Sequence, residues 1–543
     1  MKEKMAITFS LVLFFVLHLS ASATRQSPPV GDISSSFVKC METHSNPSSL
    51  ISNKIYSPTN SAFSSVLTAY IRNARFNNTA TRKPLFIVTA AHESHVQAAV
   101  ICTKAAGLHL KIRSGGHDYE GLSYISDTPF VLLDMFQLRL VTVDVADQSA
   151  WVQTGATLGE FYYNIWKKSR VLGFPAGVCP TVGVGGHISG GGYGNMLRKF
   201  GLAVDHVIDA KIVDAKGNIL DRKSMGEDLF WAIRGGGGAA FGVILSFRLK
   251  LVPVPKVVTV FQAERYLDAK NSDMTDVVVQ WQKVAPTTDD GLFMRMLIQP
   301  VNSQTKKGSK TVRITIVAMY LGNGDQLVSL LGKEFPILGL KKENVTELSW
   351  IDSVQWWDTR DNNLTKPEVL LEREPNKAGF LMRKSDYVQQ EITKQGLESI
   401  WKKVSELGKI GLVFNPYGGR MSQVPSTETP FPHRAGNLFK IQYSINWNEP
   451  GADLDKNYTA QIRTLFQHMT PFVSKNPRSA FLNYRDIDIG VNHWGANSYQ
   501  EGKAYGIRYF NDNFDRLVKV KTAVDPENFF RNEQSVPPLT SKA

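Results

Sequence analysis

The amino-acid sequence predicts a two-domain protein of mixed α/β or α+β structure, with a second domain inserted into the first. The chain has 543 residues, whereas a typical domain has roughly 150, so two domains or one large bipartite enzyme are expected. Between residues 84 and 170, apolar strand-like runs alternate with helical periodicity. A β-rich run over 241–252 then ends at Pro253 and Pro255, where the character of the sequence changes.

The predicted elements can be placed along the chain in order. Apolar runs predict strands, and apolar residues at helical spacing predict helices, over the following ranges: strands 85–88, 110–113 and 130–133, helices 92–106, 158–168 and 228–233, and a hairpin over 207–221. Residues 256–474 mix β-rich stretches with amphipathic helices such as 392–407, and the tail over 505–530 is typical of compact α/β structure. We therefore predict one domain from residues 24–255 and 475–543 and an inserted domain from residues 256–474.

Composition excludes several classes of protein. Apolar residues make up 43% of the chain and charged residues 20%, which is typical of a folded globular protein and not of a disordered chain. The 62 Lys and Arg residues exceed the 49 Asp and Glu residues, for a net charge of +13. This excess is scattered and forms no nucleic-acid-binding stripe. It fits a basic secreted protein that associates with an acidic cell-wall polymer such as pectin.

The first 23 residues are typical of a secretory signal peptide. Lys2 and Lys4 precede an apolar run from Met5 to Leu19, and Ala21-Ser22-Ala23 is a small-residue cleavage site. The run is too short to span a membrane, and no later stretch is long enough. We expect secretion to the extracellular space or cell wall, with the vacuole and the endomembrane lumen as open alternatives. Glycosylation acceptors agree with secretion and lie at Asn77, Asn344, Asn363 and Asn457.

Three cysteines are present, so in an oxidising compartment two can pair and one is left over. Cys40 and Cys102 have no catalytic partner close in sequence and form the simplest disulfide pair. Cys179 lies in a loop between glycines. Its thiol is a chance occurrence, a liability, or a covalent attachment point.

Three glycine-rich segments hold most of the candidate binding residues. Residues 183–194 hold seven glycines in twelve positions, which would let backbone N–H groups approach phosphate oxygens closely. The dinucleotide fingerprint fails because Ile188 stands where its third glycine is needed, and no Walker motif occurs. Two further segments are Arg113–Tyr119 and Arg234–Gly238.

Together these segments resemble the plant berberine bridge enzyme-like family of flavoproteins, within the vanillyl alcohol oxidase fold group. The matching motifs occur in order between about Phe37 and Leu539: Arg113-Ser-Gly-Gly-His117, Cys179 with its glycine loop, Asp228-Leu-Phe-Trp-Ala-Ile-Arg-Gly-Gly-Gly-Gly238, Asn415-Pro-Tyr-Gly-Gly419 and Asp525-Pro-Glu-Asn-Phe529. The resemblance implies an α+β flavoprotein in which both chain ends form an FAD-binding domain and the insert forms a substrate domain of sheet and helices.

The resemblance also implies FAD bound through two covalent bonds. His117 would bond the flavin 8α-methyl carbon and Cys179 the ring carbon 6, while the 183–194 loop would hold the pyrophosphate. Cys40 and Cys102 match the family's disulfide positions. The other residues expected to bind the cofactor are Arg113, Ser114, Gly115, Gly116, Val182, Gly183, Gly185, Gly186, His187, Gly190, Gly191, Gly192 and Gly194.

The substrate side resembles family members that oxidise alcohols. Family members that close rings often carry a carboxylate at the position of Gln442, and an amide cannot act as a base. We expect Tyr484 to be the base that accepts the hydroxyl proton while a hydride passes to the flavin. Lys440 would stabilise its phenolate, and Gln442 and Tyr193 would orient the substrate. A solvent-exposed Lys440 is the alternative.

The roles of three aromatic residues stay open. Tyr417 would line the pocket or merely pack, and Trp356 and Trp357 would stack on sugar rings or belong to the core.

Reoxidation and substrate class complete the expectations. By resemblance, Val182 lies near the flavin carbon that reacts with oxygen, and a small residue there goes with oxidases that produce hydrogen peroxide. The favoured function is a secreted oxidase of a monolignol or of the hemiacetal carbon of an oligosaccharide. The alternatives are a specialised-metabolism oxidase of an alkaloid-type substrate and a non-catalytic flavin-binding defence protein. No metal, nucleic acid or membrane anchor is expected.

Overall fold

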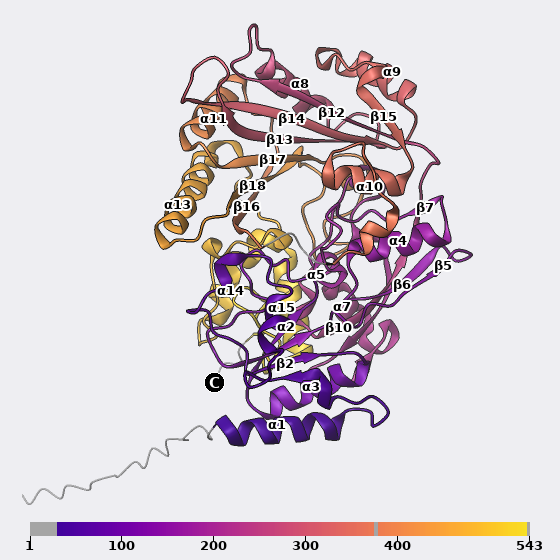
Figure 1. The fold of residues 1–543 in the computed structure, drawn as a ribbon, viewed down its shortest axis with the longest axis vertical. Coiled ribbons are helices and arrows are strands. Elements are labelled where there is room, and N and C mark those ends of the chain that lie inside the picture. The colour runs from indigo at the N-terminus through magenta and orange to yellow at the C-terminus, as the bar shows by residue number, and fades with distance from the viewer. Residues whose placement is uncertain (1–29, 374–377, 540–543) are drawn as a thin grey trace, which may run out of the picture.

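The computed structural model describes residues 30–373 and 378–539 and has the expected α+β fold in two parts (Figure 1). The lower part in Figure 1 carries a four-stranded and a five-stranded sheet, and the upper part carries a seven-stranded sheet. The predicted signal peptide, 1–23, lies outside the described residues. Within those residues, no helix is both long and apolar enough to cross a membrane.

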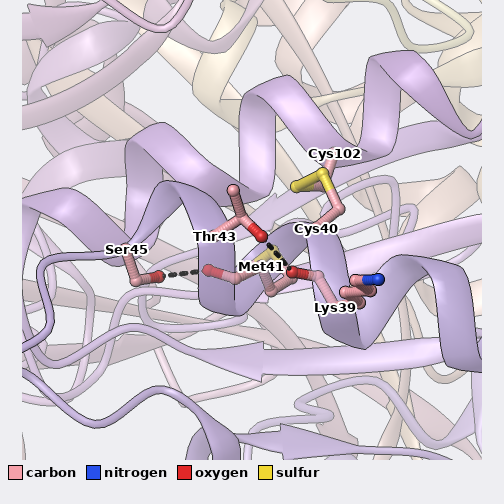
Figure 2. Close-up of a disulfide and its surroundings, with 6 residues drawn as sticks. All are labelled: Lys39, Cys40, Met41, Thr43, Ser45 and Cys102. Atoms are coloured by element: carbon pink, nitrogen blue, oxygen red, sulfur yellow. Dashed lines mark hydrogen bonds between the residues drawn. A yellow bond between two sulfur atoms is a disulfide. The ribbon is translucent and has the colours of Figure 1, made fainter.

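The four-stranded sheet of the lower part has the order β1-β2-β4-β3. Its strands are β1 (Ile55–Tyr56), β2 (Phe86–Thr89), β3 (His109–Arg113) and β4 (Phe130–Asp134). β2, β4 and β3 are parallel, and α3 (Glu93–Ala105) makes the crossover that such a pair requires. α1 (Val30–His44) packs against α3, and a disulfide joins Cys40 to Cys102 across the two helices (Figure 2). The predicted disulfide pair is therefore confirmed.

The five-stranded sheet is antiparallel with the order β5-β6-β10-β8-β9. Its strands are β5 (Val141–Asp144), β6 (Ser149–Gln153), β8 (Val207–Val213), β9 (Ile219–Leu220) and β10 (Val243–Lys250), with a small pair β7 (Leu172–Gly173) and β11 (Val252–Pro253) beside it. β8 and β9 form the predicted hairpin. Before residue 255, this part also contains the helices α2 (Phe63–Thr68), α4 (Leu158–Lys168), α5 (Val184–Ser189), α6 (Leu197–Phe200) and α7 (Arg222–Ile233). α4 begins at a capping box in which Thr157 and Glu160 satisfy each other's backbone N–H groups.

The seven-stranded sheet of the upper part is antiparallel with the order β15-β12-β14-β13-β17-β18-β16. Its strands are β12 (Val258–Tyr266), β13 (Leu292–Asn302), β14 (Lys310–Tyr320), β15 (Val345–Leu348), β16 (Phe380–Val388), β17 (Gly411–Pro416) and β18 (Phe439–Trp447). The helices are α8 (Met274–Val284), α9 (Gly324–Glu334), α10 (Trp350–Thr359), α11 (Lys394–Leu407), α12 (Arg420–Gln423) and α13 (Ala452–His468).

Alternation along these strands decides which side chains reach the lower part. Met296, Phe414 and Ile441 point into a core under α8, α11 and α13. Because successive side chains of a strand face opposite sides, their neighbours Arg295, Asn415 and Gln442 face the other way. This second face of the sheet meets the lower part.

The C-terminal tail corrects one expectation. In place of α/β structure, its described residues form two helices, α14 (Ser498–Phe510) and α15 (Asn513–Val524). Phe514, Leu517, Val518 and Lys521 are buried at the three- and four-residue spacing of one helix face. α15 packs against α7 of the lower part (Figure 1).

Charged side chains cross between the two parts. Arg75 lies 3.4 Å from Asp455 of α13, and Lys384 of β16 lies 2.8 Å from Asp486. Glu120 is buried beside them, 2% exposed, with the Arg75 guanidinium at 4.0 Å. Burial raises the pKa of Glu120 to about 8, and Asp486, Asp118 and Asp488 reinforce the shift against the opposing charge of Arg75.

Replacing Glu120 with glutamine is expected to remove a pH-dependent loss of stability. The folded protein retains the Glu120 proton at pH values where the unfolded chain, with a pKa of about 4.3, has lost it. This side chain's contribution to stability therefore falls as pH rises from about 4 to about 8. We expect Glu120→Gln to raise the free energy of unfolding at pH 8 by roughly 1–3 kcal/mol and to change it little at pH 4. Denaturant titrations at both pH values measure this, and an equal effect at both would contradict it.

Candidate active site

A cavity of about 430 Å³ lies where the lower part, the upper sheet and the C-terminal segment meet. It brings together most of the site residues expected from the sequence. Those lining it are Ser114, Gly115, Gly116, His117, Cys179, Val182, Gly183, Gly185, Gly186, His187, Gly190, Tyr193, Gln442 and Tyr484.

Five expected site residues, all in the described part of the chain, do not line this cavity: Arg113, Gly191, Gly192, Gly194 and Lys440. Arg113 is fully buried; its guanidinium lies 2.6 Å from the Asp134 carboxylate and donates to the carbonyls of Leu67 and Val66. Its place in the motif therefore reflects a structural ion pair that holds β3 to β4.

The floor of the cavity is formed by two glycine loops in close contact. A Cβ atom on Gly115 would lie only 2.4 Å from the backbone nitrogen of Gly183, so only glycine fits this approach. The Ser114 hydroxyl donates to the Thr154 carbonyl at 2.5 Å and ties the same loop to the end of β6. Bare backbone therefore faces the cavity over both loops, which suits a phosphate-bearing ligand.

Two nucleophiles stand on one wall. The Nε2 atom of His117 lies 3.1 Å from the Thr181 hydroxyl, two residues beyond Cys179. Burial, assisted by the charge of Arg72, lowers the pKa of His117 to about 3, so its imidazole is neutral. Cys179 is a free cysteine with its side chain exposed on the cavity wall. A neutral imidazole and a free thiol therefore face one cavity, and both are groups that can form a covalent bond to a ligand.

His187 supports this wall from the glycine loop. Its Nε2 atom accepts a hydrogen bond of 3.0 Å from the Gly177 N–H, in the loop that carries Cys179. Burial lowers its pKa to about 4, which keeps the ring neutral and able to accept.

A group of tyrosines occupies the side of the cavity next to the upper sheet. The hydroxyl groups of Tyr193 and Tyr484 are hydrogen-bonded to each other. The Tyr119 ring lies 5.7 Å from the Tyr484 ring, and the Gln442 amide donates to the Tyr119 hydroxyl at 2.9 Å. Burial raises the pKa of Tyr484 well above 10, so this residue is a phenol at rest.

Lys440 is not the solvent-exposed lysine of the alternative interpretation, because its side chain is fully buried. Its Nζ atom lies 3.3 Å from the Tyr193 ring centre, 3.7 Å from that of Phe481 and 4.7 Å from that of Tyr484. It has no hydrogen-bond partner among the described residues, and burial lowers its pKa well below 10.5. Lys440 therefore lies against the ring faces, outside the cavity lining, and does not hydrogen-bond the Tyr484 hydroxyl.

Sequence reasoning missed Arg295 and Tyr119. Arg295 lines the cavity, and its Nε atom donates to the Asn415 side chain at 2.8 Å. Its charge opposes the effect of burial on Tyr193 and Tyr484 by lowering both tyrosine pKa values. No motif contains Arg295, whereas Tyr119 ends the glycine segment 113–119 and could have been noticed.

The three aromatic residues left open belong to the core. Tyr417 is 1% exposed, and Trp356 and Trp357 are 4% and 5% exposed; none lines the cavity. Stacking of Trp356 and Trp357 on a substrate sugar is therefore not supported.

Comparison with known proteins agrees with this site. Residues 84–222 match the family model of the FAD binding domain, and residues 480–537 match the model described as berberine and berberine like. Both matched segments contribute residues to the cavity. The fold and site thus define an FAD-binding oxidoreductase.

Full-length relatives identify the family. The chain is 61% identical over 541 residues to berberine bridge enzyme-like 21 of Arabidopsis thaliana, covering 99% of each chain, and 58% identical over 537 residues to berberine bridge enzyme-like 2 of the same plant, covering 98% of this chain and 99% of the relative. The structure of Phl p 4, a grass pollen allergen with glucose dehydrogenase activity, superposes with a TM-score of 0.87 at 42% identity, covering 93% of this chain and 100% of that chain. The chain belongs to the berberine bridge enzyme-like family.

Proposed function

We propose that this chain is a secreted FAD-dependent oxidase that converts an alcohol to a carbonyl compound and passes the electrons to O2, giving H2O2. The alcohol would be a monolignol or the hemiacetal carbon of an oligosaccharide. The observation that carries the proposal is that His117 and Cys179 share one cavity with the hydrogen-bonded pair Tyr193 and Tyr484. The electron acceptor, the substrate and the covalent attachment are parts of the proposal.

The residues present fit bound FAD. Two glycine loops offer bare backbone for the pyrophosphate, and His117 and Cys179 would hold the ring through two covalent bonds. When bound, FAD supplies the acceptor for the hydride of the alcohol. Two covalent bonds should also raise its redox potential and prevent its loss.

We assign the role of base to the phenolate of Tyr484, because no free carboxylate lines the described cavity. Among the described residues that line the cavity, Asp118 is the single carboxylate, and it lies 2.8 Å from the Arg485 guanidinium. Tyr484 would accept the substrate proton at its hydroxyl oxygen. Tyr193 and Arg295 would stabilise the phenolate, and Lys440 would add to this from the ring faces in its protonated form. Gln442 with Tyr119 would orient the substrate hydroxyl.

Related structures support a CH–OH substrate without identifying it. Wild-type Phl p 4 is a glucose dehydrogenase, and an isoleucine-to-valine variant of it is a glucose oxidase. A glycine-to-alanine variant of berberine bridge enzyme, 34% identical with a TM-score of 0.87, is a reticuline dehydrogenase. Glucose and reticuline are therefore both substrates of proteins with this fold. A panel of monolignols, oligosaccharides and alkaloids, read out by peroxide and by anaerobic bleaching of the flavin, tests the proposal. Bleaching without peroxide would indicate a dehydrogenase, and neither signal from any substrate would favour the non-catalytic alternative.

Secretion and glycosylation remain part of this proposal. All four acceptor asparagines, Asn77, Asn344, Asn363 and Asn457, are exposed. The domain boundaries at residues 255 and 474 and the association with acidic cell-wall polymer are likewise proposed.

Replacing Val182 with leucine is expected to turn the oxidase toward a dehydrogenase. Val182 lines the cavity between Cys179 and the glycine loop, and a larger side chain there would hinder O2 from reaching the reduced flavin. We expect reoxidation by O2 to slow by about tenfold or more, equal to roughly 1.4 kcal/mol in barrier height, with little change in anaerobic flavin reduction. Double-mixing stopped-flow measurements separate the two steps. A variant that reoxidises at the wild-type rate would show that Val182 does not control oxygen access.

A further inference from the structure

One buried arginine outside the cavity joins the lower part to the upper sheet. Arg198 lies on α6 and is 1% exposed. Its guanidinium donates to five backbone carbonyls: Tyr417 at 2.9 Å, Asp289 at 2.7 Å, Leu292 at 2.6 Å, Thr288 at 2.7 Å and Pro286 at 3.3 Å. The closest carboxylate oxygen among the described residues, on Asp290, lies 3.7 Å away, and that side chain is 40% exposed.

This contact uses the whole hydrogen-bonding capacity of the side chain. A guanidinium has five N–H donors in a fixed planar fork, and here each meets a carbonyl oxygen. Burial lowers the pKa of Arg198 to about 10, so the group stays charged at neutral pH. A lysine would keep the charge but, with a single nitrogen, could not satisfy five carbonyls in this arrangement.

Two of the five carbonyls, of Leu292 and Tyr417, lie at the ends of the two strands that carry site residues, and the other three lie in the segment that leads from α8 into β13. Leu292 begins β13, three residues before Arg295, and Tyr417 directly follows β17, two residues after Asn415. Arg295 and Asn415 are hydrogen-bonded to each other. On its own side, Arg198 is five residues after Tyr193, whose hydroxyl meets Tyr484. Arg198 therefore links the segment that carries Tyr193 to the strand that carries Arg295. The charge of Arg295 opposes the effect of burial on the pKa values of Tyr193 and Tyr484.

We propose that Arg198 is a positioning residue for the reaction, which holds the ends of β13 and β17 against the Tyr193 segment and so keeps Arg295 beside the Tyr193–Tyr484 pair. The proposal rests on the proposed function, because it assigns Arg198 an effect on proton removal by Tyr484. A merely structural arginine would contribute to stability but would leave the catalytic tyrosines unchanged.

The test compares Arg198→Lys with Arg265→Lys, both as holoenzymes. Arg265 also donates to two carbonyls, of Glu264 and Leu338, but both lie within the upper part and away from the cavity. We expect Arg198→Lys to retain flavin, to slow flavin reduction at saturating alcohol at least tenfold, and to move the pH profile of that step upward by about one unit. Arg265→Lys should change neither. A wild-type limiting rate and pH profile in Arg198→Lys, or equal effects in both variants, would overturn the proposal.

The five hydrogen bonds from Arg198 to backbone carbonyls are called here the Arg198 clamp. A second variant disturbs this clamp without removing the arginine. Gly419 has φ +52°, and a Cβ atom there would lie 2.3 Å from the Arg198 carbonyl oxygen and 2.5 Å from Asp290 Oδ1. If Arg198→Lys does not fold, Gly419→Ala should slow flavin reduction and shift the pH profile in the same direction. A folded Gly419→Ala with wild-type kinetics would count against the proposal.

A measurement that needs no substrate separates this proposal from the proposed function. Hydrogen exchange of residues 286–292 should rise in Arg198→Lys relative to the rest of the chain, and the visible circular dichroism of the bound flavin should change. If wild-type protein oxidises no alcohol but these changes occur, the proposed function fails while the clamp stands. If exchange of residues 286–292 is unchanged, the clamp itself is wrong.

Discussion

Replacing Tyr484 with phenylalanine is expected to slow flavin reduction by about 10²- to 10⁴-fold, the usual contribution of a general base. The substitution removes the hydroxyl that meets Tyr193 but leaves the ring, so the cavity walls and the attached flavin should persist. Burial raises the pKa of Tyr484, and the phenolate becomes more populated as pH rises, so the wild-type rate should increase with pH. Phenylalanine should abolish that increase. Anaerobic stopped-flow measurements across pH give both quantities.

A matched control is available on the upper sheet. Tyr443 follows Gln442 on β18, points into the opposite core, and donates to Asp386 at 2.7 Å. Tyr443→Phe removes a buried hydroxyl without touching the cavity, so it should lower stability and leave flavin reduction unchanged. Wild-type reduction kinetics in Tyr484→Phe, or equal losses in both variants, would remove Tyr484 from the role of base.

Removing both nucleophiles is expected to abolish covalent flavin attachment completely. The neutral His117 imidazole and the Cys179 thiol face the same cavity, so each single alanine variant should retain flavin through the other residue after acid denaturation. The double variant His117→Ala with Cys179→Ala should release all of it. Intact mass and the visible spectrum of the washed, denatured protein measure the outcome.

His187 provides a second comparison for this experiment. Its ring accepts from Gly177 and lines the cavity but forms no bond in the proposal. His187→Ala should therefore keep both attachments or lose only the one through Cys179, whose loop it supports. Full loss of flavin in His187→Ala, with retention in the double variant, would mean that the attachment residues are misassigned.

Local patterns allowed much of the fold to be predicted. The strand at 130–134, the helix at 158–168 and the hairpin around 215–218 each have a clear period or turn signal, and the structure has them within a residue or two. The α/β prediction for the tail was wrong although Phe514, Leu517, Val518 and Lys521 have the spacing of one helix face, which is a helical signal in the sequence. The glycine motifs and the disulfide could be predicted because clustered glycines and paired cysteines have few other structural roles.

The residues from the inserted segment were harder to assign. Arg295 and Lys440 belong to strands that pack one face into the core of the upper part and turn the other face toward the cavity. Only the pairing of the seven strands decides which face is which. Lys440 could be named by motif, yet its fully buried position over three aromatic rings could not. Arg113 shows the converse, because a residue within a cofactor motif serves a buried ion pair instead.

The most direct test of alcohol oxidation by this chain is to mix the purified flavoprotein anaerobically with each alcohol of the panel and then admit oxygen. We expect at least one monolignol or oligosaccharide to bleach the flavin absorbance within seconds, and oxygen to restore it with one H2O2 formed per flavin. A flavin that no alcohol reduces, in protein that carries the cofactor in full, would contradict the assignment of this chain as an alcohol oxidase.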